Sequence, residues 1–184
     1  RAIPNLWVFR PGDANEVVES WRAIMPLERN PVAVILTRQN LPTLDRTKYA
    51  PAAGARRGAY VLADAPGGKP AVLLMATGSE LAATVAAYER LKEAGVAARV
   101  VSMPCWELFE SQDAAYRESV LPSSVTARVA VEAAAEFGWS KYLGPRGRFV
   151  GMHGFGASAP ADTLMKHFGI TPENIVEQAK AALG

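Results

Sequence analysis

A run of branched apolar residues, Val32 to Leu36, constrains the fold of this chain more than any other feature. Pro31 and Pro42 bound the segment, and an unbroken run of this kind predicts a strand that is buried on both faces, as in parallel sheets. We expect the strand to end at Arg38, and ligands of open α/β sheets bind beyond the carboxyl ends of such strands. The planar guanidinium of Arg38 suits a carboxylate or a phosphate. From position alone, an ion pair at the surface explains this arginine equally well.

The rest of the chain alternates between short apolar runs and helical periods, which predicts an α/β protein. Strands are expected at 6–9, 58–62 (an edge strand), 71–76, 100–103, 129–131 and 149–151, and helices at 13–24, 80–94, within 105–121, at 159–168 and from 172 onward. Capping-box spacing at 13–16 and 77–80, and Thr171 before Pro172, predict three helix starts. In the second of these helices, the expected apolar stripe consists of Leu81, Val85, Tyr88 and Leu91.

The segment from Pro42 to Gly58 divides this pattern in two. It carries prolines, glycines and basic residues without a sustained apolar period, which is typical of an interdomain linker. We therefore expect a strand–helix–strand remnant of one α/β domain within 1–50. A second domain over 51–184 should have a mostly parallel, open, Rossmann-like sheet of about five strands with helices on both faces. Because the chain starts at Arg1, with neither Met nor a signal peptide, we expect a piece of a longer protein.

Composition narrows the function classes. The net charge is only +2 and the basic residues are spread along the chain, which does not suggest nucleic-acid binding. The single Cys105 cannot form an internal disulfide, and no apolar run approaches the roughly 20 residues that a membrane helix needs. We expect a cytoplasmic protein with neither a nucleic-acid nor a membrane partner.

Two glycine-containing turns could approach a ligand. Residues 77–80 join a strand to a helix N-terminus, where a phosphate can bind, but one glycine is no phosphate fingerprint and Glu80 would repel an anion. We expect a plain helix cap there. The glycine-rich segment 151–160 could bring its backbone close to a ligand or another chain, and a tight turn explains it as well.

Other candidate residues favour structural roles. His153 and His167 are the only histidines and have no second ligand nearby, so we expect neither a metal site nor a catalytic dyad. Cys105 has no identifiable base and is expected to be a small buried hydrophobe. The aromatic residues expected in the core or at an interface are Trp106, Phe109, Phe137, Trp139 and Tyr142. Arg38 is thus the one residue to which the sequence assigns chemistry.

Seven motifs occur in order along the chain: 7–17 (WVFRPGDANEV), 36–42 (LTRQNLP), 76–81 (ATGSEL), 99–104 (RVVSMP), 113–122 (DAAYRESVLP), 131–136 (VEAAAE) and 154–160 (GFGASAP). Together they closely resemble the C-terminal portion of transketolases, from end to end of the chain. The resemblance implies homodimers that use thiamine diphosphate and Mg²⁺ or Ca²⁺. It also implies transfer of a two-carbon ketol unit between sugar phosphates, in the pentose phosphate pathway or the Calvin cycle.

The resemblance also implies how the chain divides. Residues 1–50 would be the end of the pyrimidine-binding domain and a linker, and 51–184 the C-terminal domain. The arginine of the family's Arg-Gln-Asn-Leu motif binds the substrate phosphate, and it falls on Arg38. The family's residues for cofactor, metal and sugar hydroxyls lie upstream of Arg1. No catalytic, cofactor-binding or metal-binding residue is therefore assigned, and the isolated chain is expected to bind no cofactor and to be inactive.

Other readings of the chain differ in class. 1-Deoxy-D-xylulose 5-phosphate synthase and the pyruvate dehydrogenase beta subunit lack the Arg-Gln-Asn-Leu sequence, whereas dihydroxyacetone synthase is closer and stays open. A non-catalytic regulatory or dimerisation module is a further alternative. The remnant over 1–41 should expose apolar side chains and strand edges unless they are covered. We therefore expect it to pack against the second domain and against a second copy.

Overall fold

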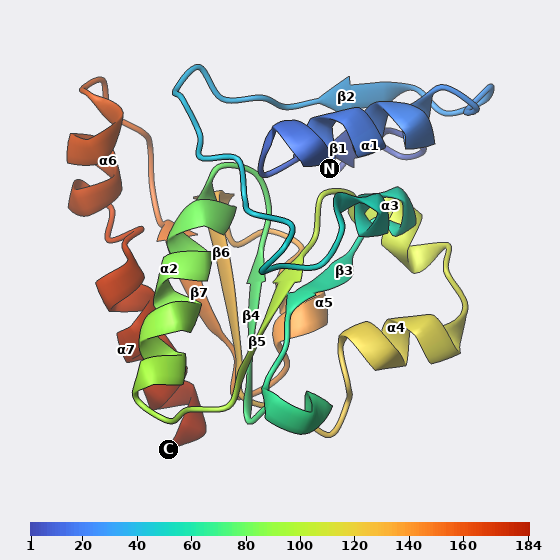
Figure 1. The fold of residues 1–184 in the computed structure, drawn as a ribbon. Helices are drawn as coiled ribbons and strands as arrows, with labels where there is room; N and C mark the ends of the chain where they lie inside the picture. Colours follow the sequence, from blue (N-terminus) through green and yellow to red (C-terminus); the bar gives the residue numbers. More distant parts are fainter.

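The computed structural model describes residues 1–184 and forms a five-stranded sheet between two layers of helices (Figure 1). The elements are β1 (Trp7–Phe9), α1 (Ala14–Ile24), β2 (Val32–Val34), the 3-10 helix η1 (Ala52–Arg57), β3 (Tyr60–Ala63), the 3-10 helix η2 (Pro66–Gly68), β4 (Val72–Ala76), α2 (Glu80–Glu93), β5 (Ala98–Ser102), α3 (Trp106–Glu110), α4 (Ala114–Val120), β6 (Arg128–Ala135), α5 (Ser140–Leu143), β7 (Arg148–Met152), α6 (Ala161–His167) and α7 (Pro172–Leu183). None of the helices has the length and apolarity that a membrane span requires.

The large sheet has the strand order β3-β5-β4-β6-β7. β4 pairs in parallel with β5 and β6, and β6 pairs in parallel with β7. The mostly parallel sheet predicted from the sequence is confirmed. β3 is the expected edge strand, but it runs antiparallel to β5. The connection from β3 to β4 contains only η2 and is too short for the crossover that parallel strands require, so β3 runs opposite to β4 and to β5, which lies between them.

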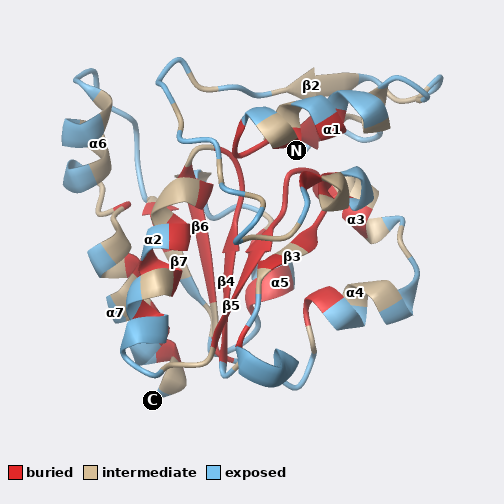
Figure 2. Ribbon diagram, in the orientation of Figure 1, coloured by how far each residue is buried: buried red, intermediate tan, exposed pale blue.

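Two apolar cores lie on the two faces of this sheet (Figure 2). Side chains of β4 alternate between them: Leu74 belongs to the core under α2 and α7, and Leu73 to the core under α3, α4 and α5. This alternation follows from the period of two along a strand. The predicted apolar stripe of α2 is confirmed, since Leu81, Val85, Tyr88 and Leu91 are all buried.

The three predicted helices begin where expected, at Ala14, Glu80 and Pro172, but only two of the three predicted caps are confirmed. The Asp13 side chain accepts a hydrogen bond from the Glu16 N–H, and the Thr171 side chain accepts one from the Asn174 N–H. The capping box at 77–80 is wrong: α2 begins at Glu80 without any side-chain cap. The Thr77 hydroxyl donates instead to the main-chain carbonyl of Arg10, which lies 67 residues earlier in the sequence.

β1, α1 and β2 form a small unit, called here the N-terminal unit, which lies across the carboxyl ends of the large sheet (Figure 1). β1 and β2 pair in parallel. The strand expected up to Arg38 is too long, because β2 ends at Val34. Its residues are half-buried rather than buried on both faces, which agrees with the apolar exposure expected of the remnant over 1–41. Ile35 and Leu36 are 46% and 57% exposed. β2 pairs only with β1, so the other edge of β2 has no partner within this chain.

The segment between the two sheets is packed against both. Arg46 donates to the Asp13 carboxylate at 2.8 Å and to the Tyr60 hydroxyl at 2.9 Å. Ala52 and Ala55 of η1 are buried. The segment is therefore held at both ends, although its composition predicts a simple linker.

Candidate functional site

Arg38 lies in the loop that follows β2, and its side chain is exposed. The flanking residues bond to each other, since the Thr37 hydroxyl contacts the Gln39 side chain and also accepts from the Gln39 N–H at 3.4 Å. The Arg38 guanidinium itself forms no hydrogen bond or ion pair with another residue of the chain, whereas Arg10, Arg46 and Arg99 are all paired with carboxylates. Its five donors are free to bind a carboxylate or a phosphate.

A cavity of about 220 Å³ lies between this loop and the start of α2. Its lining residues are Arg10, Pro11, Ile35, Leu36, Thr37, Gln39, Gly78, Ser79, Glu80, Ala133 and Met165. The loop that carries Arg38 therefore stands directly over the carboxyl ends of the large sheet. This is the edge at which open α/β sheets bind ligands.

Beneath the cavity, Arg10 joins two buried carboxylates. Its Nη2 donates to Glu80 at 3.2 Å and its Nη1 donates to Glu132. Glu132, which is 1% exposed, also accepts from Arg1 Nη1 and from Trp139 Nε1, each at 2.6 Å. Two arginines thus face two carboxylates, and Glu80 is neutralised rather than free to repel an anion. Neither Arg10 nor Glu132 is predicted from the sequence as a site residue, although a glutamate inside the apolar run 129–134 is a usable signal.

A second buried network holds α1 against the sheet. The fully buried Glu16 carboxylate accepts from the Tyr60 hydroxyl at 2.7 Å, the Ser102 hydroxyl at 2.6 Å and the Gly12 N–H at 2.7 Å. Burial raises the pKa of Glu16, although the hydrogen bonds from Ser102, Gly12 and Tyr60 oppose the shift. Burial also raises the pKa of Tyr60. This network is structural, since its groups satisfy one another.

The histidines and Cys105 take no part in either network. His153 is exposed and its ring stands edge-on to Phe149 at 6.3 Å. His167 stands edge-on to Phe168 at 4.8 Å. No group of His, Cys, Asp and Glu side chains lies together as metal ligands, so these residues do not fit a divalent metal. Cys105 is buried, as expected, and burial raises the pKa of its thiol.

The aromatic residues divide between core and surface. Trp106, Phe109, Trp139 and Tyr142 are buried together, with Trp106 and Trp139 edge-to-face at 4.7 Å. Phe137 lies outside the core and is 68% exposed. The glycine-rich segment 151–160 is largely exposed. No part of the chain approaches Gly154 or Gly156 within 4 Å of where a Cβ would stand.

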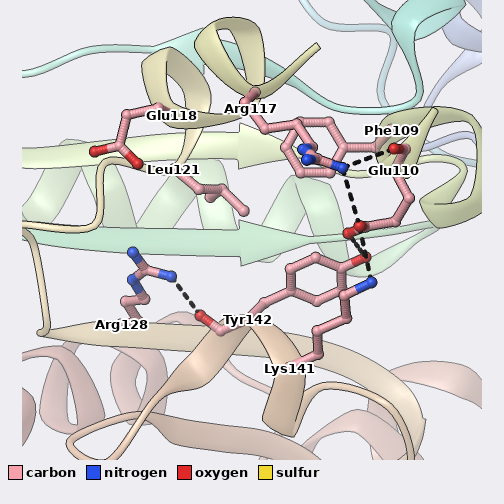
Figure 3. A pocket seen from close by; sticks show the side chains of 9 residues that line it. Phe109, Glu110, Arg117, Glu118, Leu121, Arg128, Lys141 and Tyr142 are labelled. Atoms are coloured by element: carbon pink, nitrogen blue, oxygen red, sulfur yellow. Dashed lines mark hydrogen bonds and ion pairs between the residues drawn. The ribbon is translucent and has the colours of Figure 1, made fainter. Parts of the chain in front are cut away.

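A second hollow with basic side chains, of about 320 Å³, lies beside α4 and α5 (Figure 3). Its three cations are already engaged. Arg117 and Lys141 share the Glu110 carboxylate, at 3.4 Å and 2.8 Å. The three nitrogens of the Arg128 guanidinium donate to the carbonyls of Val125, Pro122 and Tyr142. These side chains connect parts of the fold to one another. The hollow therefore has fewer free donors for an anion than Arg38 has.

The fold is that of an open α/β protein of the doubly wound class. The loop that carries Arg38 lies over the carboxyl ends of the strands of its large sheet. A family model described as "Transketolase-like TK C-terminal domain" matches residues 58–171, and one described as "Transketolase, pyrimidine binding domain" matches residues 1–43. The chain belongs to the transketolase family, and the resemblance seen in its motifs is confirmed.

Similar proteins agree over the whole chain. The transketolase of Aquifex aeolicus is 49% identical over 178 residues, which are 97% of this chain and 26% of that protein. Transketolase from Leishmania mexicana superposes with a TM-score of 0.90 at 41% identity, over 99% of this chain and 26% of that one. Transketolase of Pichia stipitis, in a crystal structure with sedoheptulose-7-phosphate, has a TM-score of 0.89 at 37% identity, over 100% of this chain and 26% of that one. The chain thus spans about a quarter of the length of these relatives.

Proposed function

We propose that this chain is the C-terminal part of an enzyme that transfers a two-carbon ketol unit between sugar phosphates, with Arg38 as the ligand of a substrate phosphate. The observation that carries the proposal is the state of Arg38 itself. Its guanidinium is exposed, has no partner in the chain and lies in the Arg-Gln-Asn-Leu segment at the carboxyl edge of the strands. Membership of the transketolase family supports the reaction, and the sugar phosphate bound by the Pichia stipitis relative supports the substrate class.

The phosphate role follows from the chemistry of the side chain. A guanidinium presents paired N–H groups that match two oxygens of a phosphate, and it stays charged at every physiological pH. Because the phosphate of a sugar lies at the end remote from the carbonyl, Arg38 would select substrates by their length and fix their position in the site. It would take no part in the bond that breaks.

Thiamine diphosphate and Mg²⁺ or Ca²⁺ would be held by parts of the full-length protein outside this chain. In support of this, the chain matches only about a quarter of the length of its transketolase relatives. In the proposed division, residues 1–50 end the pyrimidine-binding domain and 51–184 form the C-terminal domain. The full-length protein would act as a cytoplasmic homodimer.

Two experiments test the proposal. The full-length protein, supplied with thiamine diphosphate and Mg²⁺, should transfer a ketol unit from a ketose phosphate to an aldose phosphate. No transfer at any substrate concentration would overturn the assigned reaction. Titration calorimetry of the 184-residue chain should give no heat of binding with thiamine diphosphate and Mg²⁺, and saturable binding would overturn the assignment of the cofactor to other parts of the protein.

A prediction about assembly accompanies this function. Ile35 and Leu36 leave apolar surface exposed next to the free edge of β2, so a second copy is the expected cover. Light scattering should find a dimer of the 184-residue chain. Limited proteolysis between Thr43 and Arg57 should be slow. A strict monomer that is cleaved quickly in this segment, leaving a stable piece from about Gly58, would contradict the prediction.

A further inference from the structure

The most favourable place for a ligand in the large sheet is already filled by the chain itself. From β4 the chain passes through α2 to β5 on one side, and then crosses back to β6 on the other side of β4. The crevice between the loops after β4 and β6 is therefore the topological switch point, where open α/β sheets bind their ligands. Arg10, which follows β1 in the N-terminal unit, occupies this crevice between Glu80 and Glu132.

The main chain of Arg10 is bound on both sides by the loops of the large sheet. Its N–H donates to the Pro104 carbonyl at 2.7 Å, just after β5. Its carbonyl accepts from the Gly78 N–H at 2.9 Å and from the Thr77 hydroxyl at 3.2 Å, just after β4. Three hydrogen bonds thus fix one residue of the N-terminal unit across the ends of two neighbouring strands.

The guanidinium of Arg10 lies close against Gly78, whose missing side chain leaves room for it. Gly78 has φ +66°, and a Cβ at that position would stand 3.1 Å from Nη2 of Arg10. The guanidinium therefore lies flat against the backbone of the turn, with one carboxylate at each of two nitrogens. A lysine has one point charge and could not bridge both carboxylates in this way.

Arg10 is coupled to the Arg38 loop through the two short strands. The carbonyl of Phe9, the residue before Arg10, accepts a hydrogen bond from the Ile35 N–H at 2.8 Å, which is the last hydrogen bond between β1 and β2. The chain then runs over Arg10 and Pro11, because residues 35–37 and Gln39 line the same cavity as these two residues. The position of the loop relative to the large sheet is thus set where Arg10 docks.

We propose that Arg10 is a positioning residue. Its guanidinium fills the crevice, pairs with both carboxylates and holds the loop that presents Arg38. This inference rests on the proposed phosphate role of Arg38. Arg10 touches no substrate. It acts by fixing the position of β1 above the large sheet. Because β2 pairs with β1, the start of the Arg38 loop is fixed as well. Loss of its side chain would leave the crevice empty and take this partner from Glu80 and Glu132, so that the turn which binds the Arg10 main chain could shift, and the loop with it.

The test uses the full-length enzyme with one phosphorylated and one unphosphorylated ketose donor. Arg38→Ala is the reference for direct loss of phosphate binding, and Arg46→Ala is a matched control that breaks another ion pair of the N-terminal unit. Arg10→Ala should raise the KM of the phosphorylated donor by about tenfold to a hundredfold, the size expected when a binding group is misplaced by roughly 1 Å. The kcat and the unphosphorylated donor should change little.

Chemical rescue separates positioning from a general loss of packing. Methylguanidinium at millimolar concentration should enter the emptied crevice of Arg10→Ala and lower the KM of the phosphorylated donor again. It should not do so in Arg10→Ala combined with Glu132→Ala, which lacks the carboxylate. If Arg10→Ala does not fold, Arg10→Lys takes its place, with a smaller but still donor-selective rise of KM.

The outcomes are distinguishable. If Arg38→Ala affects both donors equally, the proposed phosphate role is wrong and the inference falls with it. If Arg38→Ala is donor-selective but Arg10→Ala, or Arg10→Lys in its place, is not, only the inference is overturned. An equally selective effect of Arg46→Ala would also overturn it, because the crevice would then have no special part.

Discussion

The charge of Glu132 should make a large contribution to the stability of this chain. Glu132 is 1% exposed and accepts from Arg10, Arg1 and Trp139. Glu132→Gln keeps the volume and one acceptor but leaves both arginines without this carboxylate. Removing one partner of a buried ion pair costs about 3–5 kcal/mol. Arg10 retains Glu80 and Arg1 retains the face of Trp106 at 3.8 Å, so the lower end applies.

A loss of about 3 kcal/mol corresponds to a fall in Tm of about 6–12 °C for a protein of this size. Urea unfolding of the 184-residue chain, followed by circular dichroism, measures the free energy of unfolding. The exposed Glu136→Gln, near the end of the same strand, is the control and should lie within about 0.5 kcal/mol of wild type. Combining Glu132→Gln with Arg10→Met should cost clearly less than the sum of the two single changes. A Glu132→Gln variant as stable as the control, or strict additivity, would refute the reasoning.

Three further predictions concern buried groups and turns. Because burial raises the pKa of Glu16 above its ordinary value of 4.5, folding stability should fall as the pH rises from that value through the raised pKa; urea unfolding at several pH values should show this slope in wild type and lose it in Glu16→Gln, and equal slopes would count against it. Burial also raises the pKa of the Cys105 thiol, so labelling by a disulfide reagent should be slow in the native chain and rapid in urea, and fast native labelling would disprove the buried position. Gly58→Ala should lower stability far more than Gly95→Ala, because both have positive φ but only at Gly58 would a Cβ stand 2.2 Å from the backbone of Phe109; thermal unfolding that ranks the two variants equally would contradict this.

Local patterns predicted most of the elements because their causes are local. The apolar stripe of α2 and the caps at Asp13 and Thr171 depend on residues a few positions apart, and the structure confirms them. The failures have long-range causes. The Thr77 hydroxyl could have capped α2, but it bonds to the carbonyl of Arg10, 67 residues away in the sequence. Nothing near Thr77 in the sequence signals this partner.

The site was predictable in part for the same reason. Arg38 is predicted as a site residue from its place after an apolar run, and its phosphate role stays a prediction; the structure leaves its guanidinium exposed and unpaired. The pairing of Arg10 with Glu132 joins residues 122 apart and depends on the strand order, which the sequence pattern does not contain. β2 is shorter than predicted, because only residues 32–34 pair with β1 although the apolar run continues to Leu36.

The central claim is that Arg38 binds the phosphate of the substrate, and steady-state kinetics of the full-length enzyme test it most directly. Loss of a charge-assisted hydrogen bond of about 1.5–3 kcal/mol corresponds to a roughly tenfold to hundredfold lower kcat/KM. Arg38→Ala should show this loss with a phosphorylated ketose donor and almost none with an unphosphorylated one, and Arg38→Lys should fall between Arg38→Ala and wild type. Equal losses with both donors would contradict the claim.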